Sequence, residues 1–165
     1  MATALRTSLE EYLRSHYEPE CELIDGELFP KPMGTPEHGR MQKRLLRILE
    51  RYEAKGIGEV LPELSVRHEQ DVRIPDVAFT TVVQAPGEIV SHPPLLCVEI
   101  LSPSQRPSEL FSKCEAYHAW GVPYCWVIDP IKKLAWEYHR EAPVQLASVS
   151  LGAGEISVTL AELFE

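Results

Sequence analysis

The sequence predicts an α/β fold in which a mixed β-sheet is flanked by helices. Helical patterns lie before, between and after the short apolar runs typical of buried strands, and the strand, helix, strand unit over 95 to 128 is typical of a right-handed parallel crossover. With 165 residues, 44% of them apolar and 25% charged, the chain has the size and composition of one globular domain over 1–165. The composition excludes a disordered chain, and the apolar runs are too short for a transmembrane helix.

The N-terminal segment predicts a short helix followed by a β-hairpin. Thr7-Ser8-Leu9-Glu10 has the pattern of a capping box, and Leu9, Tyr12 and Leu13 would form one apolar stripe of the helix. Asp25-Gly26 lies between two short alternating runs, which is a strong hairpin signal. The first residues lack the apolar region of a secretion signal, so we expect a cytoplasmic protein without a membrane partner. Its four cysteines lack the spacing of a zinc site, and we expect them to be reduced and buried.

A longer amphipathic helix is expected over 36 to 55. Thr35 would cap its N-terminus, Pro36 suits its first position, and Gly56 would end it. Its apolar side chains recur at helical spacing and should form a buried face: Met41, Leu45, Ile48, Leu49 and Tyr52. Its other face is basic, with a local charge of +6 − 3 = +3 in a chain whose net charge is −9.

Strands alternate with one more long helix in the rest of the chain. Apolar and alternating runs predict strands near 58 to 68, 76 to 80 and 95 to 101. A second helix begins near Ser108 and ends at Gly121, with an inward face formed by Leu110, Phe111, Cys114, Tyr117 and His118. Strands over 124 to 128 and 134 to 139 follow, and the tail has the pattern of one or two short strands and a helical turn at 160 to 164.

Two acidic residues occupy positions where a structural protein would have apolar ones. Asp76 precedes the run Val77-Ala78-Phe79, and Glu99 lies inside the strand expected over 95 to 101. Burying an unpaired carboxylate is costly, so each acid needs a cation, a donor or a metal. Neighbouring strands lie about 4.8 Å apart, which lets two carboxylates reach one ion, and such oxygen ligands suit Mg²⁺ or Mn²⁺.

Purely structural alternatives exist for these residues. Glu99 could form a buried ion pair with an arginine or with Lys113, and Asp76 could cap a turn. Lys113 lies three residues after Leu110 and four before Tyr117, so its aliphatic stem could follow the apolar face while its ammonium group reaches solvent.

A series of sequence blocks extends over most of the chain. In order, the blocks are 22 to 28 (ELIDGEL), His38, 75 to 79 (PDVAF), 98 to 104 (VEILSPS), Lys113, Tyr117, Gly121-Val122, Tyr124, Trp126 and Asp129-Pro130. This order resembles the Uma family of restriction endonucleases, within the PD-(D/E)XK nuclease superfamily. The resemblance implies a restriction endonuclease-like fold, here with an added N-terminal helix and hairpin, and a divalent metal that serves phosphodiester hydrolysis.

The resemblance also implies roles for individual residues. Asp76 matches the acid of the PD element and Glu99 the acid of the (D/E)XK element, so both would be metal ligands, together with the main-chain carbonyl of Ile100. The motif places a lysine two residues after the second acid, where this chain has Leu101. Lys113 on the following helix is the expected replacement, and it would orient or acidify the attacking water.

Glu22 and His38 lie in matching blocks, and each has two interpretations. Glu22 is either a further acid near the metal or the exposed partner of a hairpin residue. His38 either contacts substrate or merely caps and packs at the start of its helix.

We therefore expect a metal-dependent endonuclease that cuts DNA with Mg²⁺ (or Mn²⁺) and works as a homodimer, because two sites related by a two-fold axis suit cutting both strands. The net charge of −9 and the missing strand lysine favour an alternative, a nuclease-like module that binds nucleic acid or a protein without cutting. A third interpretation is a metal-dependent hydrolase of small phosphate esters.

Overall fold

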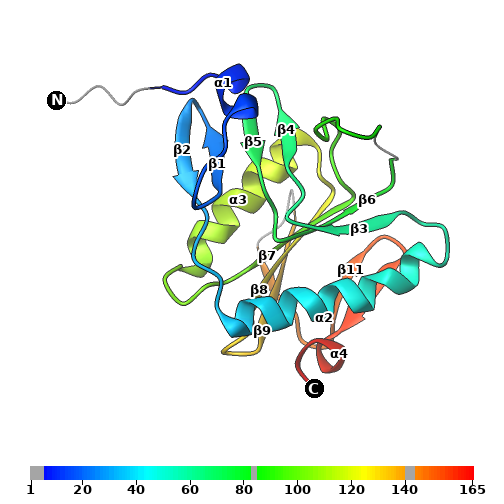
Figure 1. The fold of residues 1–165 in the computed structure, drawn as a ribbon. Coiled ribbons are helices and arrows are strands. Elements are labelled where there is room, and N and C mark those ends of the chain that lie inside the picture. The colour runs from blue at the N-terminus through cyan, green and yellow to red at the C-terminus, as the bar shows by residue number, and fades with distance from the viewer. Residues whose placement is uncertain (1–5, 83–84, 140–143) are drawn as a thin grey trace.

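A six-stranded mixed sheet forms the centre of the molecule (Figure 1). The computed structural model describes residues 6–82, 85–139 and 144–165. The strand order is β10 (Gln145–Leu146), β9 (Leu134–Tyr138), β8 (Tyr124–Asp129), β7 (Leu96–Ile100), β6 (Val77–Thr80) and β3 (Glu59–Pro62). Strands β7 and β8 are parallel and joined through α3 (Pro107–Trp120), and the other neighbours are antiparallel. The expected mixed sheet flanked by helices is confirmed.

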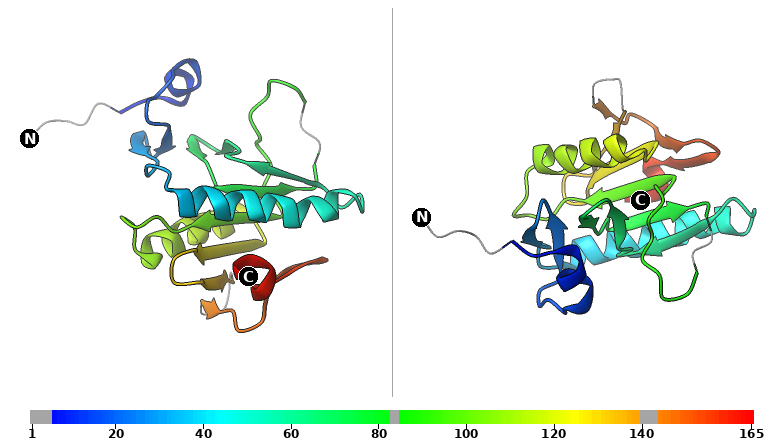
Figure 2. Two further views of the ribbon diagram at one scale, coloured as in Figure 1. Left: turned by 60° about the horizontal axis from the view of Figure 1, so that its bottom comes forward. Right: turned by 90° about the horizontal axis from the view of Figure 1, so that it is seen from above.

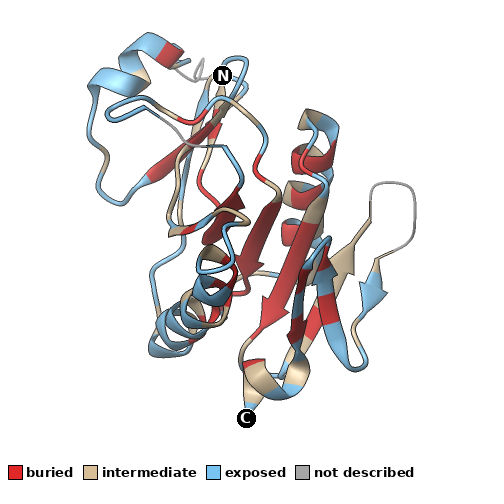
Figure 3. Cartoon of the chain, turned by 90° about the vertical axis from the view of Figure 1, so that its right-hand side faces the viewer, coloured by how far each residue is buried: buried red, intermediate tan, exposed pale blue. Residues whose placement is uncertain are grey.

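Helices α2 (Pro36–Glu53) and α3 cover opposite faces of this sheet (Figure 2). Alternate residues of β7 point to the two faces, as the pleat of a strand requires. Leu96, Val98 and Ile100 pack with the apolar face of α2, whereas Cys97 and Leu101 pack with α3. Glu99 has the same parity as Cys97 and therefore faces α3. The central strands are almost entirely buried (Figure 3).

A second, four-stranded sheet lies at the upper left of Figure 1, in the order β2 (Glu27–Pro30), β1 (Cys21–Ile24), β5 (Asp71–Arg73) and β4 (Val66–His68). The hairpin of β1 and β2 turns at Asp25 and Gly26, whose φ angles of 49° and 75° are those of the tight turn that the sequence predicts. The prediction of a single strand over 58 to 68 is wrong. This range contains two strands, of which β3 joins the central sheet and β4 joins the four-stranded sheet. Strand β5 was not predicted, since three residues are too few for a periodic pattern.

The C-terminal residues form a hairpin and a last short helix against α2. Strands β11 (Ser150–Ala153) and β12 (Ile156–Thr159) pair with each other, and α4 (Leu160–Phe164) follows directly. The helical turn expected at 160 to 164 is confirmed, and three short strands lie where the sequence predicted one or two. Arg44 on α2 donates to the carbonyl of Leu163 at 2.8 Å, which ties this end of the chain to α2.

Several local predictions need correction. Helix α1 (Leu9–Arg14) is capped by Ser8 rather than Thr7, because the Ser8 hydroxyl accepts from the Glu11 amide. Leu13 is 48% exposed and lies off the apolar stripe, and Ile48 and Phe111 are only partly buried. All four cysteines are free and buried. Among the described residues, no helix has the length and apolar character needed to cross a bilayer.

Candidate active site

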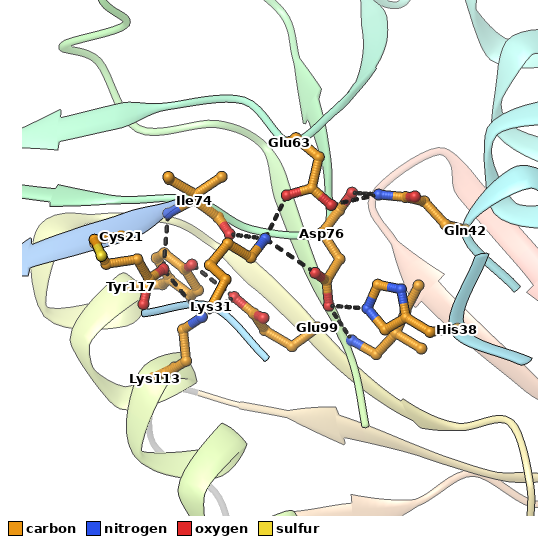
Figure 4. A network of polar contacts seen from close by, with 12 residues as sticks. Cys21, Lys31, His38, Gln42, Glu63, Ile74, Asp76, Glu99, Lys113 and Tyr117 are labelled. Atoms are coloured by element: carbon orange, nitrogen blue, oxygen red, sulfur yellow. Dashed lines mark hydrogen bonds and ion pairs between the residues drawn. The ribbon is translucent and has the colours of Figure 1, made fainter. Parts of the chain in front are cut away.

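A pocket of about 830 Å³ gathers the residues that the sequence predicted as a site. Asp76, Glu99, Ile100 and Lys113 all line it, and His38 lines it from the first turns of α2. Figure 4 shows the two acids side by side, with lysines reaching toward them from two different segments. The pocket is thus formed by parts of the chain that are far apart in sequence.

The register of two antiparallel strands explains why the two acids meet. Val77 on β6 lies opposite Val98 on β7, so one further step places Asp76 beside Glu99 on the same face of the sheet. The Ile100 amide donates to Asp76 Oδ2 at 2.7 Å. Asp76 lies just before the first residue of β6, so its side chain accepts the hydrogen bond from this main-chain amide of β7.

Asp76 is buried and fully surrounded by donors. Its Oδ1 lies 3.1 Å from Lys31 Nζ, and its Oδ2 lies 3.2 Å from His38 Nε2. Burial alone would raise the pKa of Asp76, but the His38 hydrogen bond, the Lys31 charge and the Ile100 amide outweigh it and lower the pKa to about 2. Asp76 is therefore a carboxylate at neutral pH. The interpretation in which it merely caps a turn is wrong, because its partners come from three other segments.

The surroundings of Glu99 raise its pKa, whereas those of Asp76 lower the pKa of that carboxyl group. Its Oε1 accepts a hydrogen bond from Tyr117 Oη at 2.7 Å and lies 2.9 Å from Lys113 Nζ. Complete burial raises the pKa of Glu99 to about 7; the Lys113 charge opposes this rise, and the neighbouring Asp76 and Glu22 reinforce it. Lys113 and Tyr117 are one turn apart on α3, so both reach the same carboxylate.

Lys113 points into the pocket, so the interpretation in which its ammonium group reaches solvent is wrong. It lies 2.9 Å from Glu99 and 3.0 Å from Glu22, and its side chain is only 18% exposed. Burial would lower the pKa of Lys113, but the two carboxylates more than compensate and raise it. The buried ion pair of the structural interpretation is therefore present. It also places an ammonium group beside Glu99, the second of the two acids that the motif requires.

Glu22 and His38 both contact the predicted site. Glu22 on β1 is buried, and its Oε1 accepts from the Ile74 amide at 2.8 Å. The interpretation of Glu22 as an exposed hairpin residue is wrong. The pKa of His38 is raised, chiefly by its hydrogen bond to Asp76.

Three further polar residues complete the network, and the sequence did not single them out. Lys31 Nζ lies 2.9 Å from the Ile74 carbonyl oxygen and also pairs with Glu63 and Asp76. Gln42 on α2 donates to Glu63 Oε1 and to the Asp76 carbonyl, both at 2.8 Å. The only sequence signal for Lys31 is its position between two prolines in the segment that leads to α2.

The donor set is chemically suited to a hard divalent cation. Two carboxylates face one pocket, and Mg²⁺ needs few protein ligands because it retains several waters. Within the described ranges, no group of three His, Cys, Asp or Glu side chains is arranged to hold a metal. An ion would therefore be held by the two acids and by main-chain and solvent oxygens, and it would compete with Lys31 and His38 for the oxygens of Asp76.

Comparison with known proteins identifies the family of this chain. The family model Uma2, described as "Putative restriction endonuclease", matches residues 9–165. The chain belongs to the Uma2 family. This confirms the resemblance seen in the sequence, and membership of Uma2 supports a nuclease function.

A solved structure related to this Uma2 protein has the same fold. It is described as a putative nuclease belonging to DUF820 from Anabaena variabilis ATCC 29413, and it matches with a TM-score of 0.82 at 24% identity, covering 95% of this chain and 97% of its own. No curated protein matches the chain.

Proposed function

We propose that this protein is a metal-dependent endonuclease that hydrolyses the phosphodiester bonds of DNA. The observation that carries the proposal is the convergence of Asp76, Glu99 and Lys113 in one pocket of a Uma2 protein. Two buried acids next to an ammonium group form the constellation that hydrolysis of a phosphate diester requires.

The two acids and the Ile100 carbonyl would hold Mg²⁺ or Mn²⁺. When bound, the ion supplies Lewis-acid stabilisation of charge on the phosphate and makes a coordinated water more acidic. The depressed pKa of Asp76 keeps it ionised for this role at any neutral pH.

The lysines supply positive charge to the substrate. The raised pKa of Lys113 keeps it protonated, so it orients the attacking water as a hydrogen-bond donor and does not act as a base. Lys31 has three oxygen partners in the pocket and can offset charge on a phosphate oxygen.

Cleavage of supercoiled plasmid with Mg²⁺ tests the proposal. We expect Asp76→Asn, Glu99→Gln and Lys113→Met to abolish nicking, while Glu109→Gln, at an exposed position one turn before Lys113, retains wild-type activity. Cleavage that survives both acid substitutions would refute the assignment.

One observation favours the alternative of a module that binds without cutting. Both oxygens of Asp76 are already satisfied by groups of the protein itself, as an inactive site would also require. Calorimetric titration with Mn²⁺ separates the two, because the nuclease should give heat that depends on Asp76 and Glu99. We further propose a homodimer, which sedimentation velocity would test.

A further inference from the structure

The outer face of α2 concentrates positive charge in a protein that is acidic overall. Six exposed basic residues form what we call the α2 ridge: Arg40, Lys43, Arg44, Arg47, Arg51 and Lys55. Arg40 to Arg51 lie on the helix, within an arc of about 100° and over about 16 Å, and Lys55 follows two residues after its end. The chain has 16 basic and 25 acidic residues, so an outer face needed only for solubility would carry more acids than bases.

The middle of the α2 ridge is free of internal partners. Arg44 and Arg51 are tied to the C-terminal residues, and Arg40 lies 3.8 Å from Glu37. Lys43 and Arg47, by contrast, make no hydrogen bond or ion pair with any residue that the structure describes. Their charges serve no purpose in holding the fold together.

A basic hollow marks the N-terminal end of the ridge. It has a volume of about 170 Å³, and its lining includes Arg40, Arg44 and Lys133. Lys133 comes from the turn between β8 and β9, so two distant segments bring three cations to one place. Glu37 is the only acid among its lining residues.

The ridge also begins where the catalytic pocket opens. Thr35, His38, Gly39 and Gln42 from the start of α2 line that pocket, and Lys43 of the ridge lies one turn after Gly39. A side chain at Gly39 would meet no atom within 4 Å, which leaves open space at this point. A chain of phosphates that leaves the pocket can therefore continue along the ridge.

We propose that the α2 ridge, with Lys133, binds the phosphate backbone of a nucleic-acid duplex, and this inference rests on the proposed nuclease function. One DNA strand carries a phosphate every 3.4 Å along the helix axis, so the length of the ridge on α2 corresponds to about five phosphates. Contacts of this kind position a duplex without reading its sequence.

Binding of the full-length protein to a fluorescent 20-base-pair duplex, measured by anisotropy in EDTA between 50 and 200 mM salt, tests the proposal. We expect Lys43→Gln/Arg47→Gln to weaken binding about tenfold at low salt and to reduce the slope of log K against log salt by about two, one for each lost phosphate contact. The control Arg6→Gln/Arg14→Gln removes the same charge from exposed positions outside the ridge and should bind like wild type. Both ridge positions lack internal partners, so the variant should fold normally.

Three results would overturn the proposal. The wild type does not bind the duplex, the ridge variant has the same salt slope as the wild type, or the ridge variant loses binding to anionic lipid vesicles while it still binds the duplex. Failure of the nuclease assignment gives a different result. In that case the duplex binds through the ridge but is not cut when Mg²⁺ is added.

Discussion

Replacing Lys113 with methionine should destabilise the protein in a way that depends on pH. Methionine keeps the length and apolar stem of the side chain but removes the ammonium group that lies 2.9 Å from Glu99 and 3.0 Å from Glu22. Removing one partner of a buried ion pair usually costs about 3–5 kcal/mol, because the other charge is left without compensation.

Glu99 can avoid that cost by binding a proton. Its pKa is raised by burial from 4.5 to about 7 even with Lys113 in place, and without Lys113 the pKa must lie higher still. Below pH 7 Glu99 is therefore largely neutral in both proteins, and its share of the difference in unfolding free energy should be small. An acid with a raised folded pKa loses stability as pH rises from its unfolded pKa to its folded pKa. This loss ends near pH 7 in wild type and continues above pH 7 in the variant, which should fall behind by at most about 1.4 kcal/mol per pH unit.

Urea denaturation followed by tryptophan fluorescence in EDTA, at pH 6, 7, 8 and 9, measures this difference. At pH 6 we expect a difference in unfolding free energy that comes only from the lost Glu22 contact. By pH 9 this difference should grow by as much as about 3 kcal/mol. In a Glu99→Gln background the widening should disappear. A gap that is independent of pH, or widening that persists without Glu99, would refute the reasoning.

Other predictions concern the scaffold and the pocket. The hydrogen bond from Arg51 lowers the pKa of Glu162 to about 2, so wild type should exceed Glu162→Gln by about 1 kcal/mol above pH 4.5 and lose that advantage as pH falls through 2. Gly58→Ala should destabilise by about 2 kcal/mol or more in thermal melts, because its Cβ would lie 2.3 Å from a carbonyl oxygen of β6, whereas Gly39→Ala has free space and should not. Lys31→Met should bind Mn²⁺ about tenfold more tightly in calorimetry, since a competing cation is removed from Asp76, and unchanged affinity would contradict this.

The sequence predicted the parts of the fold that depend on local patterns. The hairpin at Asp25-Gly26, the cap at Thr35 and the end of α3 at Gly121 each depend on residues within a few positions, and all three are observed. Strand pairing depends on long-range contacts instead. The sequence therefore showed apolar runs over 58 to 68 without showing that they divide between two sheets.

The same distinction applies to the site. Asp76 and Glu99 stood out because an acid in an apolar run is conspicuous. Lys31 and Gln42 did not, because no pattern around them marks a site and their partners Glu63 and Asp76 lie 21 to 45 residues away. Their part in the network follows from the arrangement of β6 against the start of α2.

The pocket draws every one of its lining residues from the stretch between Glu18 and Lys113, whereas the described residues from β8 to α4 supply packing and, at Lys133, one cation of the proposed duplex-binding surface. Chemistry and scaffold are therefore separated along the gene. Mutational drift in the last quarter of the chain can change how well the protein folds without touching the groups that line the pocket.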